Sequence, residues 1–226
     1  MRRIYVYFIS QLIFACLAAH AQDTLLPSLD TLPFPLKMRF GADVYGPVTY
    51  CFNKNILGIE CFLSVDIDPK KAIVLEAGYL DFKHSLYNYN YLSKGSFIRL
   101  GVDFNLFRRG LSLGKYYAGI GLRYGFSMFN TEVPFLTQTN YWGTATGSIP
   151  TTKSIAHYIE ASPGMRTEIF RNFSMGWVVR LRFLIYSSAS KDNKAISIPG
   201  FGNAFKTFSP GINYYLIWSI PYKTLK

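Results

Sequence analysis

Twelve charged residues occupy alternate positions within segments that are otherwise apolar, and the acids and bases among them are equal in number. The acids are Asp43, Glu60, Glu76, Asp103, Glu160 and Glu168, and the bases are Arg39, Arg99, Arg123, Arg166, Arg180 and Arg182. An arginine guanidinium is planar, stays charged and engages a carboxylate through two parallel hydrogen bonds. Such pairs suit a water-poor interior, where charges must be paired and hydrogen-bonded. We therefore predict a network of ion pairs; a narrow conducting path is the alternative.

Acyl transfer is the other chemistry to consider, and it needs a Ser or Cys within hydrogen-bond reach of a base. His157 has Ser154 and Ser162 nearby in sequence, but neither spacing matches a catalytic motif. The pattern predicts no enzyme, with a lipid-modifying enzyme kept as an alternative. No Cys/His cluster has metal-ligand spacing, and the glycines of 119–121 precede no helix. The sequence therefore predicts neither a metal nor a cofactor.

The segments that carry the charged residues alternate with a period of two. Around Arg99 the chain reads Phe97-Ile98-Arg99-Leu100-Gly101-Val102-Asp103. A β-strand places successive side chains on opposite faces, so one face of this segment is apolar and the other is polar. The pattern predicts strands at about 37–52, 57–66, 72–82, 96–106, 116–129, 155–169, 173–186 and 211–222. We expect the first strand to bend near Gly46-Pro47, because proline cannot donate to a strand ladder.

The polar face of these strands separates two kinds of all-β protein. A soluble sandwich would point many lysines to water, but here the polar face carries Arg, Asp, Glu and Gly, with Lys37 as its only lysine. This favours an antiparallel, up-and-down transmembrane β-barrel of eight strands, with lipid outside and side chains filling the lumen. The connections agree. The inner turns 67–71, 108–115 and 171–172 are short, and of the outer loops 53–56, 83–95, 130–154 and 187–208 all but the first are long.

The N-terminus has the features of an export signal. Arg2 and Arg3 precede an apolar stretch, and Ala19-His20-Ala21 is a small-x-small cleavage site. We predict a signal peptide over 1–21, cleaved before Gln22, a periplasmic lead over 22–36 and the barrel over 37–226. A retained helix is the alternative, but its apolar run is short for a membrane span. The predicted location is the outer membrane of the cell.

Composition limits the partners. The net charge is +11, but the lysines are scattered over turns and loops, so no nucleic-acid partner is predicted. The 17 Tyr and 19 Phe suit the aromatic belts of a membrane barrel. Cys51 and Cys61 are expected to point to opposite sides of a hairpin, which argues against a disulfide.

Binding residues are expected in the outer loops, because function on a rigid scaffold concentrates in loops. The candidate surface is aromatic and mildly basic, and it comprises Tyr87, Tyr89, Tyr91, Tyr141, Trp142, Phe201 and Lys206. The tyrosines of 87–91 alternate with asparagines, so the flanking strands are expected to continue as a ribbon. The predicted partners are outer-membrane lipid and lipopolysaccharide, with a glycan or a protein at the loops. The alternative is that these aromatic residues only pack the loops.

Several stretches spread over the chain carry a family resemblance. They are Arg39-Phe40-Gly41-Ala42-Asp43, Arg99-Leu100-Gly101-Val102-Asp103-Phe104-Asn105, Gly121-Leu122-Arg123-Tyr124-Gly125-Phe126-Ser127, Tyr141-Trp142-Gly143, Asn172-Phe173-Ser174-Met175-Gly176-Trp177 and Ile198-Pro199-Gly200-Phe201-Gly202. With these the chain resembles an uncharacterised, domain-of-unknown-function family of outer-membrane β-barrel proteins from Bacteroidota. The resemblance implies an outer-membrane location and eight strands, and it implies no activity. Residues 223–226 follow the last in-register aromatic, Tyr222, and depart from the commonest barrel ending.

Overall fold

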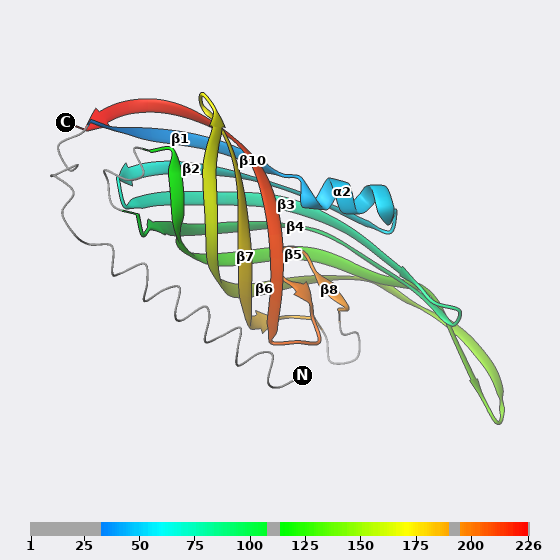
Figure 1. Cartoon of the computed structure of the whole chain (residues 1–226). Coiled ribbons are helices and arrows are strands. Elements are labelled where there is room, and N and C mark those ends of the chain that lie inside the picture. The colour runs from blue at the N-terminus through cyan, green and yellow to red at the C-terminus, as the bar shows by residue number, and fades with distance from the viewer. Residues whose placement is uncertain (1–32, 108–113, 190–194, 226) are drawn as a thin grey trace, which may run out of the picture.

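Eight strands close into a single antiparallel barrel in the computed structural model, which describes residues 33–107, 114–189 and 195–225 (Figure 1). The barrel strands are β1 Phe34–Asp43, β2 Ile56–Asp68, β3 Lys71–Ser85, β4 Tyr89–Asn105, β5 Tyr116–Asn140, β6 Gly143–Phe170, β7 Phe173–Ser187 and β10 Phe208–Leu225. Each strand pairs with the next barrel strand along the chain, and β1 pairs with β10. The predicted eight-stranded, up-and-down all-β fold is confirmed. The predicted signal peptide, residues 1–21, lies outside the described residues.

Two small elements complete the chain. Helix α2, Tyr45–Phe52, follows β1, and a hairpin of β8, Ser197–Ile198, and β9, Gly202–Asn203, lies between β7 and β10 in sequence. Over the residues described, no helix is both long enough and apolar enough to cross a membrane.

The predicted alternation is confirmed along the barrel wall. On β3, Val74 and Glu76 are buried, whereas Ile73 and Leu75 beside them are exposed. Apolar side chains therefore cover the outside of the tube and polar ones fill the inside. The wall is an inverted version of the surface that a water-soluble barrel presents.

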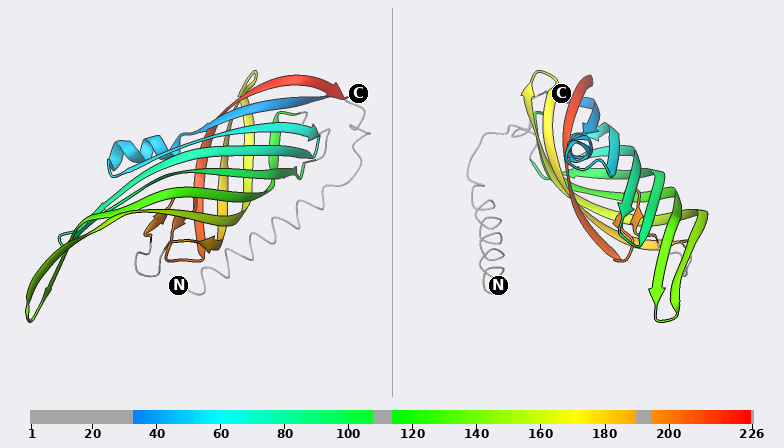
Figure 2. Two further views of the ribbon diagram at one scale, coloured as in Figure 1. Left: turned by 180° about the vertical axis from the view of Figure 1, so that it is seen from behind. Right: turned by 90° about the vertical axis from the view of Figure 1, so that its right-hand side faces the viewer.

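The two ends of the barrel differ in their connections. At one end, Phe34 pairs with Leu225, so the described ends of the chain lie together (Figure 2). The turns at this end are short. Pro69 and Lys70 join β2 to β3, and Arg171 and Asn172 join β6 to β7. Asn172 has φ +66°, a left-handed conformation that asparagine tolerates better than most residues. Residues 108–113 of the predicted third turn lie outside the described residues.

The opposite end, the loop end, carries long paired ribbons. β3 and β4 stay paired to Ser85 and Asn90, which confirms the predicted ribbon around the tyrosines. β5 and β6 stay paired to Asn140 and Gly143, so the segment 130–154 is a hairpin and not the loop that was predicted (Figures 1 and 2). Its arms are rich in threonine, which favours strands. Its tight turn is completed by Gly143 at φ +138°, a backbone conformation that L side chains rarely adopt.

The predicted first strand over 37–52 is wrong at both ends. β1 begins at Phe34, within the predicted lead, and ends at Asp43, after which the chain turns into α2. The Asp43 carboxylate accepts hydrogen bonds from the backbone N–H groups of Tyr45 and Gly46, which starts the helix. Pro47 falls in the first helical turn, where its missing N–H is harmless. Local hydrogen bonding therefore overrides the alternation after Asp43.

The segment between β7 and β10 folds into the barrel mouth at the loop end. Ile198 and Phe201 are fully buried in a cluster with Phe129, Ala156 and Tyr158 of the barrel wall. We call residues 195–204 the plug. It supplies an apolar layer above the charged interior.

Candidate functional site

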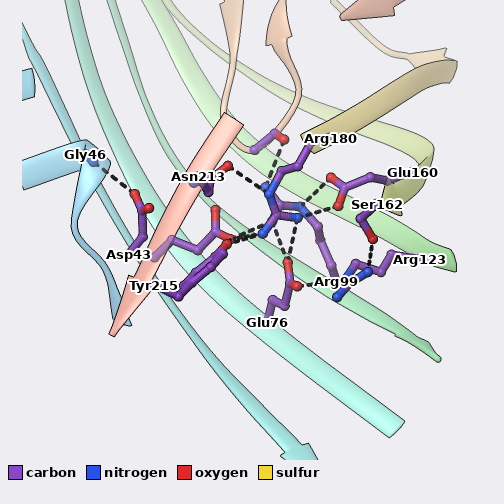
Figure 3. Close-up of polar contacts among 12 residues, drawn as sticks. Asp43, Gly46, Glu76, Arg99, Arg123, Glu160, Ser162, Arg180, Asn213 and Tyr215 are labelled. Atoms are coloured by element: carbon purple, nitrogen blue, oxygen red, sulfur yellow. Dashed lines mark hydrogen bonds and ion pairs between the residues drawn. The ribbon is translucent and has the colours of Figure 1, made fainter. Parts of the chain in front are cut away.

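The centre of the barrel holds five charged side chains that contact one another directly. Arg99 Nη1 donates to Glu60 Oε1 at 2.9 Å and to Glu76 Oε2 at 2.6 Å. Arg180 Nη1 lies 3.0 Å from Glu76 Oε2, and its guanidinium also contacts Glu60 and Glu160 (Figure 3). All five are buried, and Arg180 is 0% exposed. We call these five residues the central network.

Strand register brings this network to one depth. Each of its members comes from a different strand: Glu60 from β2, Glu76 from β3, Arg99 from β4, Glu160 from β6 and Arg180 from β7. Glu76 lies directly opposite Arg99 in the β3–β4 pairing. Opposite charges at facing positions of neighbouring strands stabilise the pairing. The alternation of polar and apolar residues predicted that these five side chains point into the barrel. The register between the strands places them at the same depth.

Neutral side chains bind the remaining donors of the two arginines. Arg99 Nε donates to the Tyr158 hydroxyl at 3.0 Å, and Arg180 Nε donates to Asn213 Oδ1 at 2.9 Å. Arg180 also contacts the Tyr215 hydroxyl. A buried charge is tolerated only when such bonds replace its lost water. Every nitrogen of the two guanidinium groups therefore has a hydrogen-bond acceptor within the protein. Neither Tyr158 nor Tyr215 was among the residues predicted, because a tyrosine gives no charge signal in the sequence.

Two more arginines extend the network. Arg123 Nε lies 2.6 Å from Glu76 Oε1, and Arg123 Nη2 lies 2.9 Å from Asp103 Oδ1. Arg182 Nε lies 3.1 Å from Glu160 Oε2. The structure thus joins eight of the twelve predicted residues in one continuous cluster.

A second layer lies nearer the short-turn end. Lys37 Nζ pairs with Glu168 at 2.5 Å, and Arg39 makes two hydrogen bonds to Asp66, one of them at 2.7 Å. Asp66 was not among the predicted residues, although it shares the even-numbered inward face of its strand with Glu60. We call this group, together with Arg166, the turn-end layer.

Arg166 departs from the prediction that it joins an ion pair. Its guanidinium lies over the ring of Tyr117, 4.9 Å from the ring centroid. Within the described part of the chain no carboxylate lies within 4.0 Å of it. It borders two small cavities, of about 20 and 40 Å³, which are large enough for single waters.

Asp43 also departs from the prediction that it joins the network of ion pairs. Its carboxylate starts α2, with Gly46 N–H donating to Oδ2 at 2.9 Å, and it forms no ion pair among the described residues (Figure 3). The alternation places Asp43 on the inward face of β1, but the helix that follows takes up its oxygens.

The plug is tied to the charged interior by its backbone. The carbonyl oxygen of Gly200 accepts from Arg99 Nη2 at 3.0 Å, and that of Phe201 accepts from Arg182 Nη1 at 3.2 Å. Gly200 has φ +74°, and a Cβ there would lie 2.5 Å from the Phe97 ring, so only glycine fits. The Tyr91 hydroxyl accepts from the Ile196 N–H at 3.0 Å. Because Phe201 and Tyr91 are buried in these contacts, their prediction as parts of an exposed binding surface is wrong.

The other predicted surface residues lie outside the barrel. Tyr87 is fully exposed at the tip of the β3–β4 ribbon, and Tyr141, 93% exposed, lies with Trp142 at the tip of the longer ribbon. The rings of Tyr141 and Trp142 pack edge to face, with centroids 5.2 Å apart. Tyr89 is half-buried, and Lys206 is exposed beside the plug. The structure therefore divides the predicted surface among two ribbon tips and the barrel mouth.

His157, the base considered for catalysis, faces outward. Its Nδ1 lies 2.6 Å from the Tyr124 hydroxyl, and its ring packs against Phe126 and Tyr186. Ser154 and Ser162 point into the barrel and are buried. The two faces of β6 thus separate this histidine from both serines. Cys51 and Cys61 are exposed and unbonded, and the described residues hold no cluster suited to a metal ion.

A closed eight-stranded barrel with an apolar exterior, a saturated ionic core and a plugged mouth defines the class of this protein. Its residues 1–225 match the model of a family described as Domain of unknown function (DUF6048). The chain belongs to this family, as the resemblance to an uncharacterised family predicted.

No curated protein matches the chain. Among solved structures, CarO of Acinetobacter baumannii is 14% identical, with a TM-score of 0.40, over 84% of this chain and 98% of its own. CarO2 of the same organism is 11% identical, with a TM-score of 0.38, over 84% of this chain and 100% of its own. TM-scores this low do not identify a shared fold.

Proposed function

We propose that this protein is a small outer-membrane β-barrel with a closed lumen, which presents a binding surface on its ribbons. The observation that carries the membrane location is the inversion of the barrel wall. Leu100, on the outside, is 58% exposed, while Arg99 beside it is 1% exposed. Burial of apolar surface is worth about 25 cal/mol per Å². A wall that exposes leucine and hides arginine is therefore stable only where its exterior meets lipid.

The central network supports the proposal of a closed lumen. Five mutually bonded side chains cross the tube at one level, and the plug covers them at the loop end. Eight strands leave an interior that side chains just fill. A continuous aqueous path would require breaking buried ion pairs, which is costly. We therefore do not favour the alternative of a narrow channel.

The binding role rests on the exposed aromatics of the ribbon tips. Tyr87, Tyr141 and Trp142 lie in the turns that join paired strands, so the ribbons carry them at their tips without burying them. Tyrosine and tryptophan offer both an apolar ring and a polar group to a partner, which supports a binding role for these tips. A glycan or a protein outside the cell is the kind of partner that such a surface suits.

Location and conductance are tested together on the mature chain. We expect it to need detergent for solubility, to insert into liposomes and to show no discrete current steps in planar bilayers. Leu100→Lys should destabilise the inserted barrel by about 2–4 kcal/mol, the cost of a lysine near the bilayer midplane. Solubility without detergent would overturn the membrane location, and regular conductance steps would overturn the closed lumen.

The binding role is tested by photo-crosslinking on intact cells. A photoreactive amino acid at position 142 should capture a defined partner, and capture from the same position should be lost when Tyr87 and Tyr141 are both changed to alanine. Phe205→Ala, an exposed aromatic change at the same end but off the ribbons, is the matched control. Equal capture in all variants, or no capture at all, would contradict a ribbon-borne binding site.

A further inference from the structure

The barrel wall has a seam toward the loop end, between β2 and β10. β1 pairs with β2 only over Met38–Ala42, and its pairing with β10 stops at Asp43. Its two neighbours continue upward, β2 to Ile56 and β10 to Phe208. In the described chain no strand bridges these two upper edges, so the closed ladder of backbone hydrogen bonds is interrupted there. Helix α2 lies over this stretch of the wall (Figure 1).

Helix α2 is suited to be an apolar cover. All eight of its residues are uncharged, none is buried, and Phe52 at its end is 89% exposed. The helix touches β2 backbone to backbone, because a Cβ on Gly46 would lie only 2.2 Å from the carbonyl oxygen of Gly58. A helix held by its first turn, with its apolar side chains outward, fits a lipid-facing position better than a water-facing one.

A cavity of about 430 Å³ lies behind this seam. Its walls are mostly apolar and come from β2, β3, β4 and the plug: Ile56, Leu80, Phe82, Phe97, Ile196 and Ile198. The lining also includes Ile59 and Tyr79, a cross-strand pair on the outer face, of which Ile59 is 52% exposed. The cavity is therefore continuous with the lipid-facing surface. Its volume falls within the roughly 300–1,000 Å³ of small-molecule sites.

The route along the barrel axis is obstructed by the plug, whose carbonyl groups are bonded to Arg99 and Arg182. The side route under α2 is bordered by Tyr45 and Thr49 of the helix and by Ile56 and Ile59 of β2, and it opens toward the lipid-facing surface. A ligand that reaches the cavity by this route must itself be apolar over most of its length. A single acyl chain meets that requirement, and the surrounding bilayer is its source.

The polar end of the cavity selects the head group. Asp43 lines it and, within the described residues, has no basic side chain within ion-pair distance. The cavity's two arginines, Arg99 and Arg182, are already engaged by Glu60 and Glu160. An anionic head would thus meet an unneutralised carboxylate and no available cation. A neutral head with hydroxyl groups can instead donate to the acceptor sites of the Asp43 carboxylate that Tyr45, Gly46 and Asn213 leave open.

We propose that this cavity binds a single-chain amphiphile with a neutral, hydroxylated head, which enters from the bilayer through the seam beneath α2. The site is separate from the ribbon tips, and it rests on the proposed function only in requiring that the barrel is inserted in lipid.

The test uses the mature chain in phosphatidylcholine nanodiscs with a diazirine-bearing monoacylglycerol. We expect saturable crosslinks to peptides that contain Ile56, Leu80 or Ile198. In Gly58→Leu the new side chain extends into the cavity, because a Cβ there has only Leu80 Cδ1 at 3.8 Å and Gly46 Cα at 4.0 Å as neighbours. If the new side chain excludes two or more methylene groups of the probe's acyl chain from the cavity, labelling should weaken at least about tenfold. Leu80→Trp, a second filling variant, should have the same effect.

Gly147→Leu is the matched control, since a Cβ there meets nothing within 4 Å. It should label like the unchanged chain. A fatty-acid probe of the same length should label the cavity less than the monoacylglycerol does. Labelling confined to the outer face, or unchanged in both filling variants, would overturn the site, and stronger labelling by the fatty acid would overturn the neutral head.

Failure of this inference can be told apart from failure of the proposed function. Heat-modifiable migration on gels and co-elution with the nanodisc report insertion before any probe is added. A chain that inserts but does not label the cavity contradicts the amphiphile site alone. A chain that does not insert contradicts the membrane location itself.

Discussion

Arg99 and Arg166 are two guanidinium groups inside one barrel, but their surroundings differ. Arg99 forms ion pairs with three carboxylates, and it donates to a tyrosine hydroxyl and a plug carbonyl. Arg166 lies over a tyrosine ring beside small cavities, with no carboxylate within ion-pair distance among the described residues. Equal numbers of acids and bases in the sequence therefore do not mean equal pairing in space. Both arginines of the central network are paired with carboxylates, whereas the turn-end layer contains one arginine, Arg166, that has no such partner among the described residues.

The largest loss of stability should come from a substitution in the central network. Arg180→Ala leaves Glu60, Glu76 and Glu160 without one of their main partners, so we expect a loss of about 3–5 kcal/mol in the free energy of unfolding. Urea unfolding of the barrel in liposomes, followed by tryptophan fluorescence, measures it. Arg180→Lys should recover part of the loss, because a lysine restores the charge without the planar fork. A loss below about 1 kcal/mol would mean that the network does not stabilise the barrel.

The plug gives the next effect. Gly200→Ala forces a side chain into a left-handed backbone position and against Phe97, which should cost roughly 1–3 kcal/mol and displace the plug from the mouth. Protease cleavage within residues 187–208 should become faster than in the unchanged chain. Gly147→Ala, on the exposed ribbon, serves as the control. Unchanged cleavage would show that the plug does not depend on this turn.

A smaller effect is expected at the start of α2. Asp43→Ala removes the acceptor for the N–H groups of Tyr45 and Gly46 in the first turn of α2, one residue before the N-cap Val44. We expect a loss of about 0.5–2 kcal/mol, as for other side chains that bond the first N–H groups of a helix. Amide hydrogen exchange should rise in α2 and stay unchanged in the barrel strands. Asp43→Asn, which keeps an acceptor oxygen, should restore protection. Faster exchange throughout the barrel would instead assign Asp43 to the ionic interior.

The smallest effect should come from Arg166. Arg166→Met keeps the side-chain volume and removes a buried charge that lacks a carboxylate partner. The loss of the contact with the Tyr117 ring, roughly 0.5–2 kcal/mol, is offset because the cost of desolvating that charge is also removed. We expect the same urea titration to show a net change within about 1 kcal/mol. A loss as large as that of Arg180→Ala would remove the distinction between the two levels.

The sequence was sufficient to predict the barrel, its strand number and the inward face of Arg99, Arg123 and Arg180, because alternation fixes which face a strand residue occupies. It did not predict depth along the tube, which depends on register between strands far apart in the chain. The pairing of Arg39 with Asp66 and the isolation of Arg166 are both matters of depth.

Two other misses have local causes. The helix after Asp43 begins with hydrogen bonds from backbone N–H groups to the Asp43 side chain. The alternation of polar and apolar residues gives no sign of such bonds. The burial of Phe201 follows from a loop that folds back into the mouth, and composition alone does not separate such a loop from an exposed one. The surface at Tyr141 and Trp142 was predicted, but the paired arms that carry it were not.

The arms of the β5–β6 hairpin have a mechanical consequence. β6 pairs with β7 only from Ala156 onward, so the thirteen residues from Gly143 up to that point form part of an overhang. At about 3.3 Å per residue the overhang is roughly 40 Å long, which exceeds the ~30 Å hydrocarbon thickness of a bilayer. Because β4 stays paired with the β5 arm up to Leu136, the overhang is braced along most of its length, and Trp142 is held at its tip, far from the upper edge of β7.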